Sequence, residues 1–339
     1  MSERELPFVS VVVPVFNRKQ WVQELIESLR RQTYPADRFE VILVDNGSTD
    51  GLWEWLQEST RDPSLRLRCF RNELPDKFPA VSRNVALGHA RGEIIAFIDS
   101  DCWSVPGWLR EGVAAFQDGI GVVVGKTIPD PADPHTVLFQ TRTVLSDKCN
   151  FDTCNIFYRR EAIDKAGGFG QDFITFCSKR TRQPGRLALE LPYGEDIDLG
   201  YRVKRLGYRS TFAKEALVMH HIKPQTAWAW LTEPWGASTY PYIVKKHPEI
   251  RKELLWCRYF LSPVTGLFDV LLLGCCLAWL VHPGFLLLAL PYLVAKVRQG
   301  GRHLSLAMRG VRLVAATCRA LIIFAVLLYG SIRYRSLVI

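Results

Sequence analysis

Two aspartates separated by one residue, Asp99 and Asp101, have the types and spacing to do chemistry. They directly follow Ile94–Ile98, an apolar run that predicts a buried strand. Carboxylates at positions i and i+2 past a strand end can converge on one divalent cation. Mg²⁺ and Mn²⁺ prefer oxygen ligands, among them the oxygens of a diphosphate. Taken alone, the sequence Asp99-Ser100-Asp101 is more typical of a turn whose acids are solvated. The case for a metal site therefore depends on which other groups lie close to it.

Other charged side chains could complete a site for a nucleotide-linked substrate. Asp45 ends a second apolar run, where its carboxylate could accept a hydrogen bond from a pyrimidine ring N–H or a ribose hydroxyl. Arg83 could bind a diphosphate bidentately. Glu195 and Asp196 begin a predicted helix, whose dipole favours the ionised carboxylate, and this suits a general base for an acceptor hydroxyl. Taken singly, these residues are also typical of a turn acid, an exposed helix charge and a helix cap.

Strands and helices alternate along the first hundred residues, and this order predicts how the acidic groups are brought together. Such alternation is typical of an open, mainly parallel α/β sheet. Ligands of such sheets bind outside the carboxyl ends of the strands, which is where Asp45, Asp99 and Asp101 fall. The predicted strands are Phe8–Val15, Phe39–Val44, Leu65–Phe70 and Ile94–Ile98, with Val122–Val124 and Asn155–Tyr158 after them.

Six sequence segments, taken in order, resemble the family 2 glycosyltransferases of the GT-A fold, which are inverting enzymes that use nucleotide sugars. The resemblance covers Phe8 to about Tyr240. It implies an open mixed, mainly parallel sheet flanked by helices, a divalent metal (Mn²⁺ or Mg²⁺) and a donor linked to UDP, GDP or dTDP. The segments are VSVVVPVFNR, VILVDNGSTDG, SRNVALGHARGEIIAFIDSDC, CNIFYRREAIDKAGGF, GEDIDLGYRVKRLGYR and VMHH.

The resemblance also implies roles for individual residues: a donor-binding set, a metal set, a catalytic base and an acceptor side. The base is Asp196, and either His220 or His221 could point into the site. The implied residues are Pro14, Val15, Asn17, Asp45, Arg83 and Asp99 for the nucleotide and diphosphate, Asp101 and His220 for the metal, and Asn155 and Glu195 for the acceptor side.

Departures from the family pattern narrow these expectations. Asn46 stands where many members have a second Asp, which leaves Asp45 as the strong acceptor there. Cys154 replaces a frequent Gly before Asn155, so we expect a narrower acceptor pocket. The Gln/Arg-x-x-Arg-Trp signature of processive synthases is absent, and Trp235 follows Thr-Glu-Pro instead, which disfavours a chain-extending polysaccharide synthase. A Rossmann oxidoreductase is excluded because no G-x-G-x-x-G follows the first strand.

The last hundred residues combine basic charge with long apolar runs. Of the formal net charge of +9, residues 1–240 carry −1 and residues 241–339 carry +10. This combination is typical of a membrane anchor at an anionic leaflet. Because no nucleic-acid motif is found, we expect no nucleic-acid partner. The candidate membrane segments are Leu261–Val281, Phe285–Ala295 and Leu313–Ile332. The second is shorter and could be either the return arm of a hairpin or a half-buried segment.

One face of the predicted C-terminal helix is basic, with Arg302, Arg309, Arg312 and Arg319 on it. Arg319 lies inside an apolar stretch, where an unpaired charge is costly, and its own helix carries no acid. We therefore expect Arg309, Arg312 and Arg319 to contact a lipid phosphate or diphosphate. The alternative is that the side chains of Arg309 and Arg312 extend to the membrane interface and that Arg319 simply lies near a helix end.

These features predict a glycosyltransferase domain at 1–240, a basic linker at 241–260 and a membrane-associated helical region of two to three segments at 261–339. The N-terminus lacks the features of a signal peptide, and the nine cysteines show no paired metal spacing. We therefore expect a cytoplasmic catalytic domain anchored to the inner or plasma membrane.

The function expected from the sequence is metal-dependent, inverting transfer of a sugar from a nucleotide sugar to a lipid-linked or glycan acceptor in cell-surface glycan or polysaccharide synthesis. One alternative is a polyprenyl-phosphate glycosyltransferase that makes a lipid-phospho-sugar. A non-enzymatic alternative is a membrane-tethered sensor or scaffold that binds nucleotide sugars. Such a sensor would need Asp45 and Asp101 but no acid at Asp196, so the presence of all three favours catalysis.

Overall fold

The computed structural model describes residues 6–74, 78–134, 138–148, 150–171, 174–175, 194–299 and 306–339. The chain forms two compact units. Among the described residues, the first comprises those within 6–134, 141–175 and 195–223, and the second comprises those within 138–140, 194 and 224–339. Residues 224–240 thus pack with the second unit, whereas the domain boundary predicted from the sequence lies after Tyr240.

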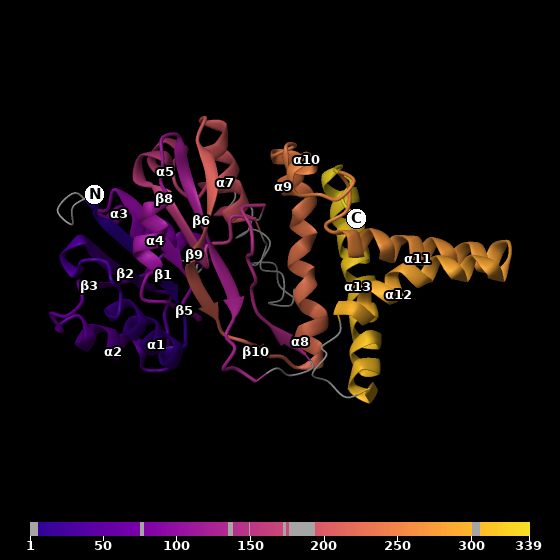
Figure 1. Cartoon of the computed structure of the whole chain (residues 1–339), viewed down its shortest axis with the longest axis horizontal. Helices are drawn as coiled ribbons and strands as arrows, with labels where there is room; N and C mark the ends of the chain where they lie inside the picture. The colour runs from indigo at the N-terminus through magenta and orange to yellow at the C-terminus, as the bar shows by residue number, and fades with distance from the viewer. Residues whose placement is uncertain are drawn as a thin grey trace. The chain divides into compact units, whose positions relative to one another are not determined.

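The first unit is built on one eight-stranded sheet with the strand order β3-β2-β1-β4-β8-β6-β9-β5 (Figure 1). Parallel pairs join β1 to β2 and β4, β2 to β3, and β6 to β9. Antiparallel pairs join β8 to β4 and β6, and β5 to β9. The predicted mixed, mainly parallel sheet is confirmed. The strands are β1 (Val9–Val15), β2 (Phe39–Asp45), β3 (Leu67–Arg71), β4 (Ile94–Ile98), β5 (Cys102–Ser104), β6 (Ile120–Pro129), β8 (Asn155–Arg159) and β9 (Arg209–His220).

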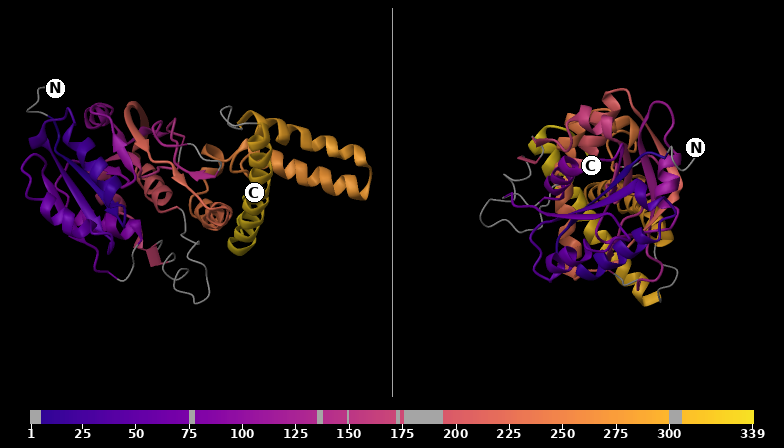
Figure 2. Two further views of the ribbon diagram at one scale, coloured as in Figure 1. Left: turned by 90° about the horizontal axis from the view of Figure 1, so that it is seen from below. Right: turned by 90° about the vertical axis from the view of Figure 1, so that its left-hand side faces the viewer.

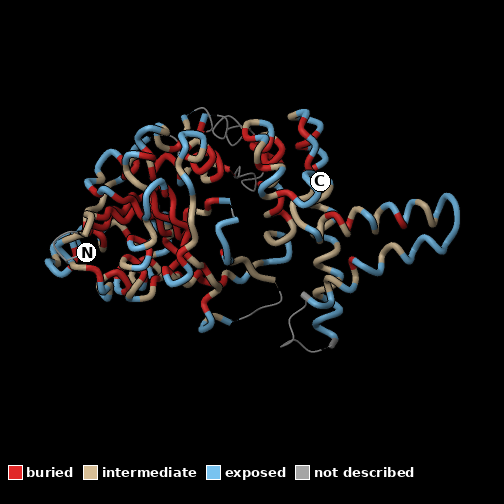
Figure 3. Tube along the Cα trace, turned by 45° about the horizontal axis from the view of Figure 1, so that its top comes forward, coloured by how far each residue is buried: buried red, intermediate tan, exposed pale blue. Residues whose placement is uncertain are grey.

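Both faces of the central strands are covered. Every residue of β2 and β4 is buried, and successive side chains of a strand point to opposite faces, so packed elements must lie on both sides (Figure 3). The packing is tight enough to require glycine at position 112, because a Cβ atom there would come within 2.3 Å of the Phe157 ring. The helices of this unit are α1 (Lys19–Arg30), η2 (Ala36–Arg38), α2 (Leu52–Ser59), α3 (Pro79–His89), α4 (Trp108–Ala114), α5 (Arg160–Ala166) and α7 (Glu195–Arg205).

The second unit is mainly helical. Its short elements are α8 (Ala227–Thr232), η3 (Glu233–Thr239), α9 (Tyr240–Lys246) and α10 (Ile250–Glu253). The longer ones are α11 (Pro263–Leu280), η4 (Pro283–Ala289), α12 (Leu290–Gln299) and α13 (Leu306–Tyr334). A two-residue strand pair, β7 (Phe139–Gln140) with β10 (Lys223–Pro224), stands apart from the large sheet.

A helical hairpin projects within this second unit. The helix α11 begins with a capping box between Ser262 and Thr265, and the chain turns back at His282 into η4 and α12, which run alongside α11 (Figures 1 and 2). Gly274 permits the close approach, because a Cβ atom there would lie 2.8 Å from the Cβ atom of Leu288. The segment Phe285–Ala295 is therefore the return arm that the sequence suggested.

Two helices of the second unit are long and apolar enough to cross a membrane. They are Pro263–Leu280, with mean hydropathy 1.8, and Ala307–Tyr334, with mean hydropathy 2.2. At 1.5 Å per residue, the 18 residues of the first extend about 27 Å, close to the thickness of a hydrocarbon core. Large apolar side chains at the hairpin turn are exposed, with Trp279 at 89% (Figure 3). Both helices overlap predicted membrane segments. Arg302, which the sequence places on the basic face of the C-terminal helix, lies outside the described residues.

Candidate active site

A single buried arginine joins acidic side chains from two distant parts of the chain. The Nη2 atom of Arg83 lies 3.1 Å from Oδ1 of Asp99, just past the end of β4. Its Nη1 atom lies 3.4 Å from Oε1 of Glu195 and 3.5 Å from Oδ1 of Asp196, at the start of α7. The guanidinium also lies 5.6 Å from the centre of the Phe169 ring. Arg83 therefore holds the start of α7 against the aspartate motif, an arrangement that its expected contact with a diphosphate did not include.

Asp196, the predicted base, has surroundings that suit proton transfer. The backbone N–H and the hydroxyl of Thr153 donate hydrogen bonds to its Oδ2 atom over 3.1 and 3.0 Å. Burial and the neighbouring Glu195 carboxylate raise the pKa of Asp196 to about 8, against the opposing effects of Arg83 and the Thr153 amide. A carboxyl group with a pKa near neutrality can gain and lose a proton at physiological pH. The predicted helix start at Glu195 is confirmed.

The second aspartate of the motif lies among cations. The Oδ2 atom of Asp101 is 3.2 Å from Nη1 of Arg18 and 3.7 Å from Nε2 of His220, and it forms an ion pair with the ammonium of Lys223. Burial opposes ionisation of Asp101, but His220, Lys223 and Arg18 together hold its pKa below the usual range. This carboxylate is therefore ionised and poised for a cationic ligand.

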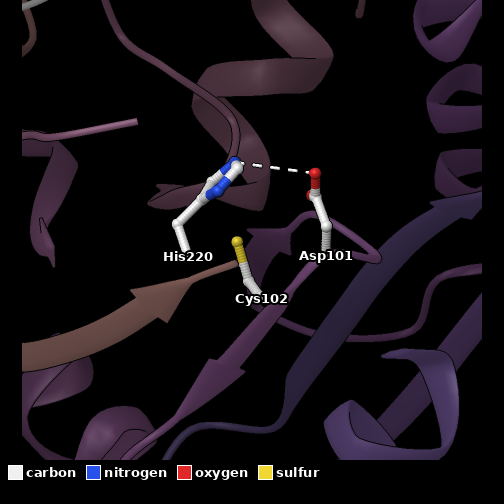
Figure 4. Close-up of side chains that lie close together, drawn as sticks. All are labelled: Asp101, Cys102 and His220. Carbon is white, nitrogen blue, oxygen red and sulfur yellow. Dashed lines mark ion pairs between the residues drawn. The ribbon is translucent and has the colours of Figure 1, made fainter. Parts of the chain in front are cut away.

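The sheet decides which of the two adjacent histidines reaches Asp101. The antiparallel strands β5 and β9 pair Cys102 with His220, and this register brings the His220 ring to the aspartate motif (Figure 4). His221 instead stacks on Trp21, with ring centres 5.1 Å apart, and its Nδ1 atom lies 3.0 Å from Asp133. His220 is therefore the histidine that faces the aspartate motif.

The residues around Asp101 fit a divalent cation. Asp101, Cys102 and His220 offer ligand atoms within 4.8 Å of one another. A carboxylate and an imidazole suit Mn²⁺, and a carboxylate that also has diphosphate oxygens beside it suits Mg²⁺. Burial raises the pKa of the Cys102 thiol well above its usual range, so this sulfur remains a neutral thiol and a poor ligand. A cation held by Asp101 would take the place of the Lys223 ammonium that pairs with this carboxylate.

A second group in the described part of the chain, Asp130, Asp133 and His221, meets the same distance criterion. The indole N–H of Trp103 donates to Asp130, and the backbone N–H of Ile222 donates to Asp133 over 2.7 Å. These carboxylates and the stacked His221 thus join β5 to the loop after β6, which is a structural role.

The residues predicted to bind the nucleotide lie at the carboxyl ends of β1 and β2. Asp45 is fully buried, accepts a hydrogen bond from the Ser48 N–H over 3.0 Å and lies 3.6 Å from Nε of Arg71. Asn17 adopts φ 44°, donates its N–H to Ser48 Oγ over 2.8 Å and accepts from the Thr49 N–H over 2.8 Å. Asn tolerates this left-handed conformation better than most residues. The two loops are therefore joined into one polar rim.

Two other residues predicted to bind the nucleotide lie in the strand beneath these loops. Pro14 and Val15 end β1 and stand beside Val44 and Asp45 of β2 in parallel register. Asn46, the departure from the family pattern, accepts from Asn72 over 2.9 Å and also from Ser82. Asn46 therefore braces the nearby loops.

Asn155 has a different environment from the acceptor side at which the sequence placed it. Its amide nitrogen donates to the carbonyl oxygens of Lys126 and Ala216 over 2.8 and 2.9 Å, and its Oδ1 accepts from the Trp108 indole over 2.8 Å. The side chain is buried, and these three bonds occupy it within the sheet. We assign it no contact with an acceptor.

Three residues near the site were missed in the sequence, namely Arg18, Thr153 and Lys223. Each lies close to a quoted motif: Arg18 ends the VSVVVPVFNR segment, Thr153 precedes CNIFYRR, and Lys223 comes three residues after His220. That closeness was the available signal. Only the folded sheet shows that Arg18 and Lys223 meet at Asp101 while Thr153 meets Asp196.

Comparison with known proteins defines the class. Residues 10–170 match the family described as Glycosyl transferase family 2. Residues 10–170 thus form a domain of this family, and the protein is a glycosyltransferase. It is 29% identical over 230 residues to "Glycosyltransferase AglE" from Haloferax volcanii, a match that covers 65% of this chain and 68% of AglE.

Further similarity is to two proteins with solved structures. The structure of "Mannosyltransferase PcManGT from Pyrobaculum calidifontis in complex with GDP-Man and Mn2+" matches with a TM-score of 0.57 and 18% identity, over 98% of this chain and 88% of that one. TarS of Staphylococcus aureus, residues 1–349 with UDP-GlcNAc, matches with a TM-score of 0.51 and 19% identity, over 97% and 92%. These likenesses show the GT-A fold.

In sequence, TarS, described as "Poly(ribitol-phosphate) beta-N-acetylglucosaminyltransferase TarS", is 38% identical over 109 residues. The match covers 32% of this chain and only 18% of TarS.

Proposed function

We propose that the protein is a metal-dependent, inverting glycosyltransferase that moves a sugar from a nucleotide sugar to a lipid-linked acceptor in cell-surface glycan synthesis. One observation carries the proposal. A half-buried Asp196 with a pKa near neutrality is held by Arg83 next to the Asp99 and Asp101 motif. A base placed this close to a diphosphate-binding motif suits a displacement reaction, in which an acceptor hydroxyl attacks the anomeric carbon and the nucleoside diphosphate leaves.

Asp196 acts as the base in this mechanism. It takes the proton of the acceptor hydroxyl while the hydroxyl oxygen attacks the anomeric carbon on the face opposite the leaving nucleoside diphosphate. The new C–O bond forms as the bond to the diphosphate oxygen breaks, and the anomeric configuration inverts. Thr153 fixes the carboxylate through two hydrogen bonds. Glu195 would line the acceptor side.

Asp101 and His220 would hold the divalent cation, Mn²⁺ or Mg²⁺, and Asp99 would contact it or the ribose. When bound, the cation stabilises the charge of the leaving diphosphate. Arg18 and Lys223, which pair with Asp101 in the structure, supply two further positive charges at this edge.

The donor is a nucleotide sugar linked to UDP, GDP or dTDP. Structures of the similar proteins contain GDP-Man and UDP-GlcNAc, which supports this substrate class. Asp45, Pro14, Val15 and Asn17 would hold the base and the ribose. Arg83 pairs directly with Asp99, and through this ion pair it would position Asp99 beside the diphosphate.

The second unit anchors the enzyme to the membrane, with the catalytic unit in the cytoplasm. Its two long apolar helices and the exposed apolar hairpin turn support this, together with the +10 charge of residues 241–339. An anchored enzyme acts readily on an acceptor that is itself held in the bilayer, which is why we favour a lipid-linked acceptor.

The test uses the full-length protein purified in detergent with a panel of nucleotide sugars. We expect release of the nucleoside diphosphate from one donor, dependent on Mn²⁺ or Mg²⁺ and abolished by EDTA. Transfer to a lipid-linked acceptor should give a product of inverted anomeric configuration by NMR. Release that is unaffected by EDTA, or a product with retained configuration, would contradict the proposed mechanism.

A further inference from the structure

A cavity of about 940 Å³ lies inside the second unit, at the open end of the helical hairpin. Its wall comes from the first turns of α11, around Phe268, the last turns of α12, around Lys296, and the middle of α13, from Arg309 to Leu327. The hairpin turn at His282 is at the other end of α11. The cavity therefore opens among the basic residues, away from the apolar turn.

One part of the cavity wall is cationic. Lys296, Arg309, Arg312 and Arg319 line it, whereas Asp269 is the acid among the lining residues. Arg319 is engaged by a partner outside its helix, because its guanidinium forms an ion pair with Glu233 and donates to the Trp230 carbonyl oxygen. Four basic side chains against two carboxylates leave the wall with an excess of positive charge, which favours an anion.

The rest of the wall is apolar. The α13 residues Leu313, Ile323, Phe324 and Leu327 line it together with Phe268 of α11, and both helices have the length and composition of membrane spans. A wall with a cationic end and an apolar side matches a ligand that joins a phosphate to a hydrocarbon chain. The volume is that of a site for a drug-sized ligand, which is room for one phosphate group and the first part of one chain.

We propose that this cavity binds the phosphate-bearing end of the acceptor lipid, a single-chain alcohol linked through phosphate or diphosphate. The phosphate lies against Lys296 and Arg312, and the chain follows Phe268 and Phe324. The naming of this lipid as the acceptor rests on the proposed function. Of the three arginines expected to contact a lipid phosphate, Arg312 keeps that role in the proposal, whereas the anionic partner of Arg319 is Glu233.

The test variants neutralise the two proposed phosphate ligands, as Lys296→Gln and Arg312→Gln. Their matched controls are Arg298→Gln on α12 and Arg333→Gln on α13, two exposed basic residues of the same helices outside the cavity wall. Arg319 is left intact, because removing it would strand Glu233. Circular dichroism and gel filtration in detergent verify that each full-length variant is folded.

The probe is farnesyl phosphate, with farnesol and phosphatidylglycerol as comparison lipids, and binding is measured by native mass spectrometry of the full-length protein. We expect one saturable farnesyl phosphate, bound about tenfold more weakly by each test variant and unchanged in the controls. Farnesol should bind at least about tenfold more weakly, because it lacks the charged group.

Equal binding by wild type and test variants would overturn the proposal. So would displacement of farnesyl phosphate by an equal concentration of phosphatidylglycerol, since the cavity would then be a general phospholipid site. The measurement needs no donor, metal or turnover. A protein that binds the probe as expected but cleaves no nucleotide sugar would therefore disprove the transferase mechanism and leave the lipid site standing. A protein that cleaves a nucleotide sugar but does not bind the probe as expected would disprove the lipid site and leave the transferase mechanism standing.

Discussion

The Nη1 atom of Arg83 lies 3.5 Å from the Oδ1 atom of Asp196, so a buried cation directly contacts the proposed base. Two opposing influences act on that carboxyl group. Burial and Glu195 raise the pKa of Asp196 to about 8, while Arg83 lowers it. The balance between them determines the pH at which the base is ready, and this makes the pair testable.

Replacing Asp196 with Asn keeps the shape of the side chain but removes its basicity. We expect turnover to fall by roughly 100-fold or more, with donor affinity close to that of the wild type. Transfer rates and nucleotide binding would be measured side by side. The control is Asp164→Asn, an exposed carboxylate on α5 that should leave both unchanged. Retention of most of the transfer activity would reduce Asp196 to a helix cap.

Arg83→Gln should move the pH profile toward alkaline values. A base must be deprotonated to act, so the wild-type rate should rise as the pH increases through about 8. Loss of the cation removes the influence that lowers the pKa of Asp196, and the rising limb should shift upward. The measurement is kcat/KM from pH 6 to pH 10 in both proteins. An unshifted profile with a lower rate would give Arg83 a purely structural role.

Thermal unfolding should depend on pH through the same carboxyl group. The pKa of Asp196 is about 8 in the folded protein and near 3.8 in the unfolded chain, so between these values the folded state keeps a proton that the unfolded chain releases. The contribution of this group to stability is full below about pH 4 and is lost as the pH rises through about 8. Asp196→Asn should therefore raise Tm relative to the wild type more at pH 8.5 than at pH 4.5. Equal differences at both pH values would contradict the shifted pKa.

Metal binding should respond in opposite directions to two substitutions around Asp101. Asp101→Ala should weaken binding of a nucleoside diphosphate far more than binding of the nucleoside, because the cation bridges phosphate oxygens. Lys223→Gln should tighten Mn²⁺ binding in the absence of donor, because the ammonium that pairs with this carboxylate is gone. Equilibrium binding of the nucleoside diphosphate and of the nucleoside tests the first variant, and Mn²⁺ titrations followed by electron paramagnetic resonance test the second. Looser Mn²⁺ binding in Lys223→Gln would show that the lysine does not compete with the cation.

Local patterns in the sequence were enough to predict the strands that lead to Asp45 and Asp99, the helix that starts at Glu195 and the apolar helices of the C-terminal region. Each depends on hydrophobic periodicity or on capping within a few residues, which are properties of neighbours in the chain. The ordered motifs likewise identified the family.

The partners within the site were decided only by the tertiary structure. The choice between His220 and His221 follows from the register of β5 on β9, and the partner of Arg319 is Glu233, 86 residues away. Asn155 illustrates the same limit, since its side chain donates hydrogen bonds to carbonyl oxygens of β6 and β9, strands that come near it only after folding. Contacts between distant segments are set by strand order and helix packing, and neither is encoded in any short stretch of residues.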